Sequence, residues 1–114
     1  MDYKLVWTSL AREDLREIVR YIARDNVAAA RRVGGRILEA VEVLGRMPEL
    51  GRMVPERDDP KIREIIRGNY RIVYRVCQAP RRIEIWRIWH GARGEPQFDE
   101  PGSITSGNSH PAAV

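Results

Sequence analysis

Two amphipathic helical segments, separated by only two residues, limit the folds open to this chain more than any other feature. After Thr8 and Ser9, which can cap a helix, apolar residues recur at helical spacing. The pattern stops at Asp25-Asn26 and resumes in a second expected helix from Val27 to Leu44. Helices joined by so short a break form an antiparallel hairpin, whose apolar side needs a second layer to cover it. The two stripes consist of Ala11, Leu15, Ile18, Val19 and Ile22, and of Ala30, Val33, Ile37, Ala40, Val41 and Leu44.

Two consecutive glycines lie inside the second expected helix. Gly34 and Gly35 each cost about 1 kcal/mol relative to alanine in a helix interior. A close approach of the two helices would explain why both are tolerated. We therefore expect the helices to touch along this part of the hairpin.

Strand patterns surround the helical hairpin. Before it, Tyr3–Trp7 alternates apolar and polar residues. After it, Gly45 and Pro48 end the helix, and the turn-rich stretch Pro48–Arg52 leads to three segments with β propensity. The order β-α-α-β-β-β predicts a compact α+β fold, with both helices on one face of a mostly antiparallel sheet. The three later strands are expected at Ile62–Arg67, Tyr70–Val76 and Ile83–Trp89, with a turn at Gly68-Asn69 and a hairpin loop at Gln78–Arg82.

Length and composition predict one domain, at residues 1–98, followed by a tail at 99–114 that has little to bury and is expected to be disordered. The first residues lack the basic and apolar regions of a signal peptide, and no apolar run approaches the roughly 18–20 residues that span a bilayer. We therefore expect a cytoplasmic protein without a membrane partner. The single cysteine, Cys77, excludes an intramolecular disulfide, and with two histidines we expect no metal and no cofactor.

Basic residues are concentrated in one part of the chain. Residues 61–98 carry nine Lys or Arg against three acidic residues, whereas residues 1–60 are balanced. Eighteen of the twenty basic residues are arginines, which bind carboxylates and phosphates through two parallel hydrogen bonds. The distribution favours a surface that binds an anionic partner, although any single arginine is more often a solvated surface residue.

The strand Tyr70–Val76 has two different faces. One face carries Tyr70, Ile72, Tyr74 and Val76 and is expected to pack on the helices. The other carries Arg71, Val73, Arg75 and Cys77 and is expected to be open. Two interpretations of the arginines stay open: they contact a binding partner, or they pair with acidic neighbours on adjacent strands.

Five short motifs occur in a fixed order between about residues 3 and 98. They are Ala11-x-x-Asp14-Leu15-x-x-Ile18-x-x-Tyr21-Ile22, Pro48-x-x-Gly51-Arg52, Arg63-Glu64, Tyr70-Arg71-Ile72-Val73-Tyr74 and His90-Gly91-Ala92-Arg93. With this order, the sequence resembles the RelE/ParE family of type II toxin–antitoxin toxins. The resemblance implies the family's microbial RNase-like α+β fold, which agrees with the element order inferred from the residues alone.

The family divides by target, and the resemblance implies one of two activities. RelE-like toxins cut messenger RNA on the ribosome, and ParE-like toxins inhibit DNA gyrase. The nuclease branch carries cations at three strand positions that are Ile62, Glu64 and Ile66 here, and an aromatic hydroxyl where this chain has Phe98. RNA cleavage needs such groups to move protons and neutralise phosphate. The sequence is therefore closer to the ParE branch, with ribosome-dependent RNA cleavage as the alternative.

The resemblance also implies partners. The expected partners are a cognate antitoxin and DNA gyrase, or the ribosome and mRNA in the alternative, with operator DNA contacted only through the antitoxin. Candidate antitoxin contacts are three apolar residues off the main helical stripes and one arginine: Leu10, Val27, Leu38 and Arg67. Candidate target contacts are Arg71, Arg75, His90 and Arg93. Arg71 and Arg93 become candidate catalytic residues only if the chain is a nuclease, and His90, as a lone histidine, is more often structural or exposed.

Overall fold

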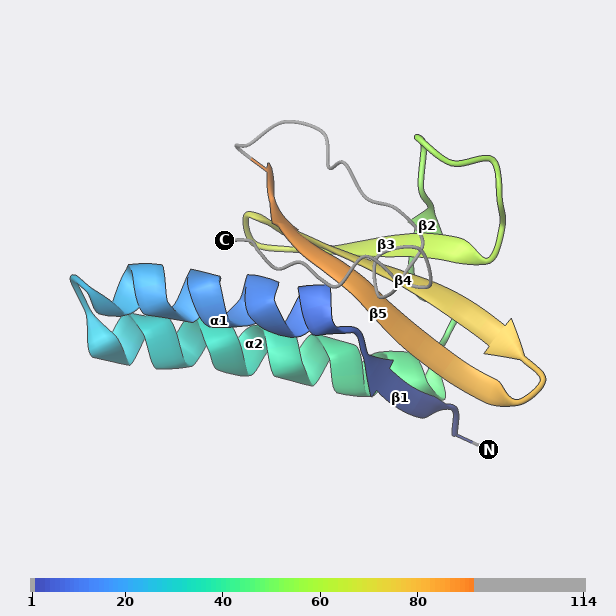
Figure 1. The fold of residues 1–114 in the computed structure, drawn as a ribbon, viewed down its shortest axis with the longest axis horizontal. Coiled ribbons are helices and arrows are strands. Elements are labelled where there is room, and N and C mark those ends of the chain that lie inside the picture. Colours follow the sequence, from blue (N-terminus) through green and yellow to red (C-terminus); the bar gives the residue numbers. More distant parts are fainter. Residues whose placement is uncertain (1, 92–114) are drawn as a thin grey trace.

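A computed structural model describes residues 2–91 of the chain (Figure 1). It contains two helices and five strands in the order β-α-α-β-β-β-β. Their bounds are β1 Lys4–Trp7, α1 Ser9–Ala23, α2 Val27–Arg46, β2 Arg52–Met53, β3 Ile62–Arg67, β4 Tyr70–Gln78 and β5 Arg81–His90. The predicted α+β class and the predicted helices and longer strands are confirmed.

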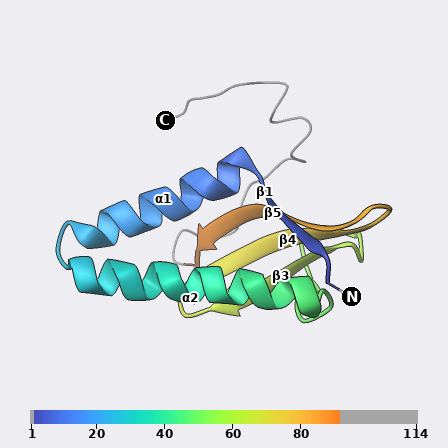
Figure 2. The same ribbon diagram turned by 90° about the horizontal axis from the view of Figure 1, so that it is seen from below.

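The strands form one sheet in the order β1-β5-β4-β3-β2, and both helices cover the same face of it (Figure 2). The β1–β5 pair is parallel and the other three pairs are antiparallel. The short strand β2 was not predicted, because two residues show no alternation. The loop expected at Gln78–Arg82 is shorter in the structure, since β4 continues to Gln78 and β5 begins at Arg81.

Side-chain caps fix where the helices begin. The Thr8 hydroxyl accepts a hydrogen bond from the Ala11 amide at 3.1 Å and donates to the Ile85 carbonyl at 2.8 Å, so it joins α1 to β5. Asn26 Oδ1 accepts from the Ala29 amide at 2.9 Å and starts α2 immediately after α1 ends. The hairpin geometry therefore follows from residues at the two helix starts.

The two consecutive glycines of α2, Gly34 and Gly35, have different environments. A Cβ on Gly34 would lie 3.2 Å from Val19 Cγ2, so the close approach of the helices is confirmed there. A Cβ on Gly35 would meet nothing within 4 Å, and the expectation that packing explains this glycine is wrong. Of this pair, only Gly34 is therefore a packing requirement.

The main core lies between the helices and the inner face of the sheet. As predicted, Ile72, Tyr74 and Val76 of β4 are buried there. The prediction of an open outer face is wrong in part, because Val54, Ile62, Val73 and Trp86 form a second buried cluster on the other side. The register shift between Val73 and Tyr74 leaves Trp86 as an extra residue in β5, and the chain after β2 brings Val54 against it.

Candidate functional site

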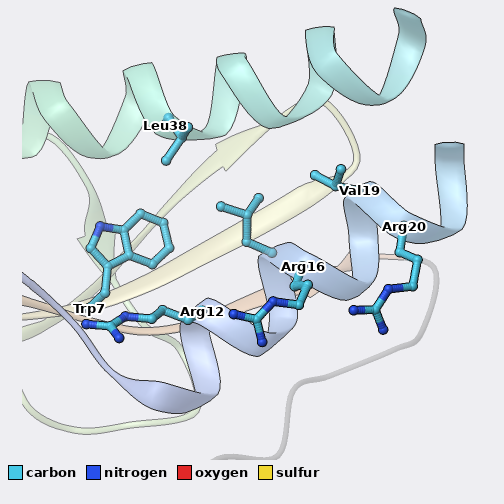
Figure 3. A pocket seen from close by; sticks show the side chains of 7 residues that line it. Trp7, Arg12, Arg16, Val19, Arg20 and Leu38 are labelled. Atoms are coloured by element: carbon cyan, nitrogen blue, oxygen red, sulfur yellow. The ribbon is translucent and has the colours of Figure 1, made fainter. Parts of the chain in front are cut away.

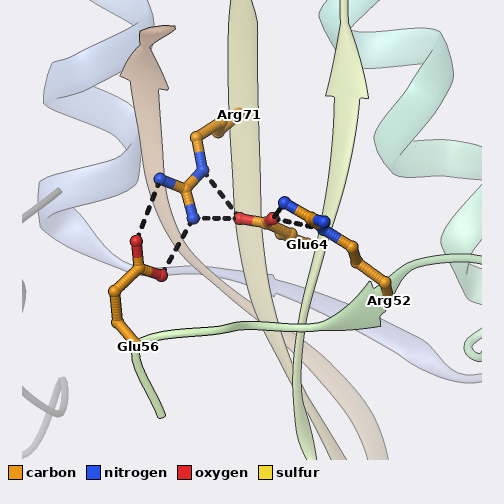
Figure 4. A network of polar contacts seen from close by, with 4 residues as sticks. All are labelled: Arg52, Glu56, Glu64 and Arg71. Carbon is orange, nitrogen blue, oxygen red and sulfur yellow. Dashed lines mark hydrogen bonds and ion pairs between the residues drawn. The ribbon is translucent and has the colours of Figure 1, made fainter. Parts of the chain in front are cut away.

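Arg71 lies at the centre of a charged cluster on the outer face of the sheet (Figure 4). Its Nε donates to Glu64 Oε1 at 2.7 Å, and its Nη2 also contacts that oxygen. The outer edge of the same guanidinium faces Glu56, with Nη2–Oε1 at 3.0 Å and Nη1–Oε2 at 3.4 Å. Of the two interpretations of Arg71, pairing with acidic neighbours is the one that the structure bears out.

Glu64 is the buried carboxylate that binds both arginines of this cluster. Its side chain is completely buried, and its second oxygen accepts hydrogen bonds from Nε and Nη2 of Arg52, both at 2.7 Å. The Arg52 side chain is 66% exposed, whereas that of Arg71 is only 14% exposed. A buried carboxylate needs such partners because an unpaired buried charge is strongly destabilising.

The ion pair between Glu56 and Arg71 shifts the pKa of both side chains. Hydrogen bonding from Arg71 lowers the pKa of the Glu56 carboxyl below its ordinary value, although partial burial opposes the shift. Burial alone would lower the pKa of Arg71, but the hydrogen bonds to Glu56 and Glu64 outweigh it and raise the pKa. Both groups are therefore charged at neutral pH, and the ion pair persists.

A second polar cluster holds the connection between α2 and β2. The buried Tyr74 hydroxyl donates to the Pro48 carbonyl at 2.8 Å and accepts from the Gly51 amide at 2.9 Å. Arg63 Nη1 donates to the Gly51 carbonyl at 2.8 Å. A Cβ on Gly51 would overlap the Glu64 carbonyl oxygen and lie 2.7 Å from the Tyr74 hydroxyl, so only glycine fits. Three of the motifs that carried the resemblance thus meet in a structural junction.

Arg75, the second candidate target residue, lies further along the outer face of β4. It is opposite Glu84 on β5, with Nη1–Oε1 at 3.9 Å. Glu84 has closer partners, because Arg82 Nε donates to it at 2.9 Å and Trp86 Nε1 at 3.2 Å. Arg75 therefore keeps a partly exposed side chain with one long ion pair.

His90 does not lie with these arginines. It is opposite Tyr70 in the sheet and meets its ring edge to face, with centroids 5.1 Å apart. Tyr70 packs against the main core, so His90 is on the helix side of the sheet. Of the candidate target contacts, His90 therefore lies on the opposite side of the sheet from Arg71 and Arg75, and Arg93, like Phe98, lies outside the described residues.

The three strand positions that distinguish the nuclease branch now have defined environments. Ile62 is buried in the outer cluster, Glu64 binds both Arg52 and Arg71, and Ile66 is 49% exposed. At these positions the strand therefore carries a buried, ion-paired carboxylate and apolar side chains instead of cations. Within residues 2–91, no group of three His, Cys, Asp or Glu side chains is placed to hold a metal ion.

A groove with a volume of about 560 Å³ lies between the two helices beside the end of β1 (Figure 3). Its floor is apolar and includes Trp7, Val19 and Leu38, the last of which is 48% exposed. Three arginines at four-residue spacing border it along α1, namely Arg12, Arg16 and Arg20. Among the described residues, Arg16 pairs with Glu13 at 2.7 Å, and no ion pair engages the other two. The groove thus combines an apolar floor with a positive rim.

The predicted antitoxin contacts do not form one surface. Leu38 lines this groove, but Arg67 lines a separate cavity of about 410 Å³ between α2 and the β3–β4 turn. Val27, 57% exposed, begins α2, and Leu10, in the first turn of α1, lines neither cavity. The row of arginines along α1 is not among the residues predicted to bind a partner. The four-residue spacing of Arg12, Arg16 and Arg20 is visible in the sequence and places the three side chains on one side of the helix.

Comparisons with known proteins agree with this architecture. The family model described as the ParE toxin of the type II toxin–antitoxin system, parDE, matches residues 5–94. The fold is similar to a chain of the toxin–antitoxin complex RelBE2 from Mycobacterium tuberculosis, with 24% identity and a TM-score of 0.61 over 79% of this chain and 99% of that chain. It is also similar to a chain of the chromosomal ParDE system from P. aeruginosa, with 26% identity and a TM-score of 0.62 over 77% and 95%. No curated protein matches the chain.

Proposed function

From the premise that this chain belongs to the ParE toxin family of type II toxin–antitoxin systems, we propose that it inhibits DNA gyrase by binding it and does not cleave RNA. The chain is the toxin component of such a system. In this proposal, the toxin acts through a protein–protein interface, so its surface needs shape and charge rather than an acid–base pair.

The observation that supports binding over RNA cleavage is the pairing of Arg71. To stabilise a phosphorane, a guanidinium must present free N–H groups to the phosphate oxygens. Here the buried Glu64 holds one edge of Arg71 and Glu56 occupies the other, so a phosphate reaches the guanidinium only by displacing a carboxylate. Glu64 also stands at a position where the nuclease branch carries a cation, so one cation fewer is available there to neutralise a phosphate.

Among the described residues, no hydroxyl or imidazole of the outer face lies beside Arg71 to donate a proton, and the two carboxylates there are ion-paired. The hydroxyl of Tyr74 is buried and already donates to a carbonyl, and burial raises its pKa. His90 is on the opposite side of the sheet. Among the described residues, the outer face around Arg71 therefore supports recognition better than catalysis.

Gyrase inhibition is tested with the purified full chain, gyrase, relaxed plasmid and ATP. We expect the toxin to block supercoiling or to accumulate cleaved DNA, and the cognate antitoxin to reverse the effect. A toxin that stops growth in cells but leaves purified gyrase active at every concentration tested would overturn the proposal.

We further propose that the groove between α1 and α2 receives the antitoxin. An amphipathic helix can place apolar side chains on Trp7 and Leu38 and carboxylates opposite the arginine row of α1. Because Arg12 and Arg20 have no ion pair within residues 2–91, an acidic segment gains new pairs without breaking existing ones. The apolar floor supplies affinity, and the arginines fix the register.

A matched pair of substitutions on α2 tests the groove. Leu38 and Val27 are both exposed apolar residues of this helix, but only Leu38 lines the groove. We expect Leu38→Ser to weaken antitoxin binding at least ten-fold, or about 1.4 kcal/mol, and Val27→Ser to change it little. Titration calorimetry measures both, and equal losses in the two variants would show that the groove is not the antitoxin site.

A further inference from the structure

The guanidinium of Arg71 has one permanent and one exchangeable partner. Glu64 holds the Nε side from a strand, is completely buried and is also bound by Arg52. Glu56 meets the outer Nη1–Nη2 edge at 3.0 and 3.4 Å, from the irregular connection between β2 and β3, and its side chain is 25% exposed. Glu56 can therefore turn away by side-chain rotation while Glu64 keeps the guanidinium oriented.

The surroundings of this edge show what could replace Glu56. Arg71 is opposite Ile66 on β3 and opposite Trp89 on β5, so the three side chains form a row across the outer face. Ile66 is 49% exposed, and Trp89 is half-buried, with the Arg87 guanidinium 5.2 Å from its ring centroid. A cation that can form two parallel hydrogen bonds, with apolar side chains beside it, suits a carboxylate carried by a protein segment.

Charge favours the same ligand. Arg52, Arg71, Glu56 and Glu64 sum to zero, and turning Glu56 away leaves one positive charge that a single carboxylate restores. The connection that carries Glu56 also contains Asp58 and Asp59. Arg57 and Lys61 in the same connection balance these two charges, so the single positive charge of Arg71 defines the ligand.

We propose that the outer edge of Arg71 is a docking point for an acidic side chain of a protein partner with an apolar neighbour, and that Glu56 is its internal, displaceable occupant. Glu56 then competes with the partner, and the observed affinity is reduced by the fraction of molecules in which Glu56 is in place. The surface differs from the helical groove and requires nothing about gyrase.

The test removes the Glu56 carboxylate by substitution and measures the binding of an acidic peptide to the exposed edge of Arg71. Glu56→Gln in the full chain is compared with the wild type and with Glu13→Gln, which removes the same charge from an exposed pair on α1. The probe is an acetylated and amidated Leu-Glu-Leu peptide, with Leu-Gln-Leu as its control, and NMR follows the guanidinium signals of Arg71. If Glu56 occupies Arg71 in about nine molecules of ten, Glu56→Gln binds the acidic probe about ten-fold more tightly than the other two proteins.

Two further measurements distinguish a protein ligand from a phosphate or a nucleic acid. Ile66→Ser in the Glu56→Gln background should weaken the peptide several-fold and leave inorganic phosphate binding unchanged, because phosphate makes no apolar contact. Equal binding of the probe by Glu56→Gln and Glu13→Gln would overturn the proposal, as would unmoved Arg71 signals. Tighter binding of a single-stranded oligonucleotide than of the acidic peptide would overturn the choice of a protein partner.

Discussion

Removing Arg71 should destabilise the fold far more than removing Arg52, although both bind the same carboxylate. Arg71 is 14% exposed and Arg52 is 66% exposed. Without Arg71, the buried Glu64 keeps only a solvent-exposed partner, and breaking a buried pair in this way costs about 3 kcal/mol. Without Arg52, Glu64 keeps Arg71, and the loss of an exposed pair costs about 0.5 kcal/mol.

For the two alanine variants at neutral pH, urea unfolding measures the loss of free energy of unfolding, and thermal unfolding measures the loss of melting temperature. For a domain of this size, about 3 kcal/mol lowers the melting temperature by about 15 °C, and about 0.5 kcal/mol lowers it by about 3 °C. Arg71→Lys keeps the charge but loses the two-pronged geometry, so it should fall between them. Equal, small losses for Arg71→Ala and Arg52→Ala would refute the reasoning and restore Arg71 as a freely available target contact.

Three further predictions concern the same two clusters. Tyr74→Phe leaves the Pro48 carbonyl and the Gly51 amide without their buried partner, so the free energy of unfolding should fall by about 2 kcal/mol in urea titrations with unchanged slope. Gly51→Ala should cost at least about 2 kcal/mol by the same assay, because its Cβ overlaps a strand carbonyl; a neutral result would mean that the junction relaxes easily. Because Arg71 lowers the pKa of Glu56 from 4.5, the pair stabilises the fold above that pH. The stability difference between wild type and Glu56→Gln, about 1 kcal/mol at pH 7, should therefore vanish as the pH falls through the folded-state pKa; a constant difference would contradict this.

Local patterns predicted the scaffold well. The stripes of α1 and α2 and the caps at Thr8 and Asn26 depend on residues within four positions of each other, so the sequence displays them directly. The long strands β3, β4 and β5 follow from β-branched and aromatic runs. Their positions were predicted to within a few residues.

Contacts made by irregular segments were not predictable in the same way. Glu56 reaches Arg71 across 15 residues from a connection without periodicity, and no spacing rule pairs them. The second buried cluster depends on the extra residue at Trp86, which shifts the pattern of β5 and hides the outer face under Val54.

The most direct test of the central claim is a cleavage assay on translating ribosomes. The purified full chain is added at the concentration that inhibits gyrase, and primer extension maps the mRNA. We predict intact mRNA, because the outer face holds Arg71 between two carboxylates and presents no proton donor beside it within residues 2–91. Codon-positioned cuts that appear with the wild type and disappear with a folded Arg71→Lys variant would contradict the account.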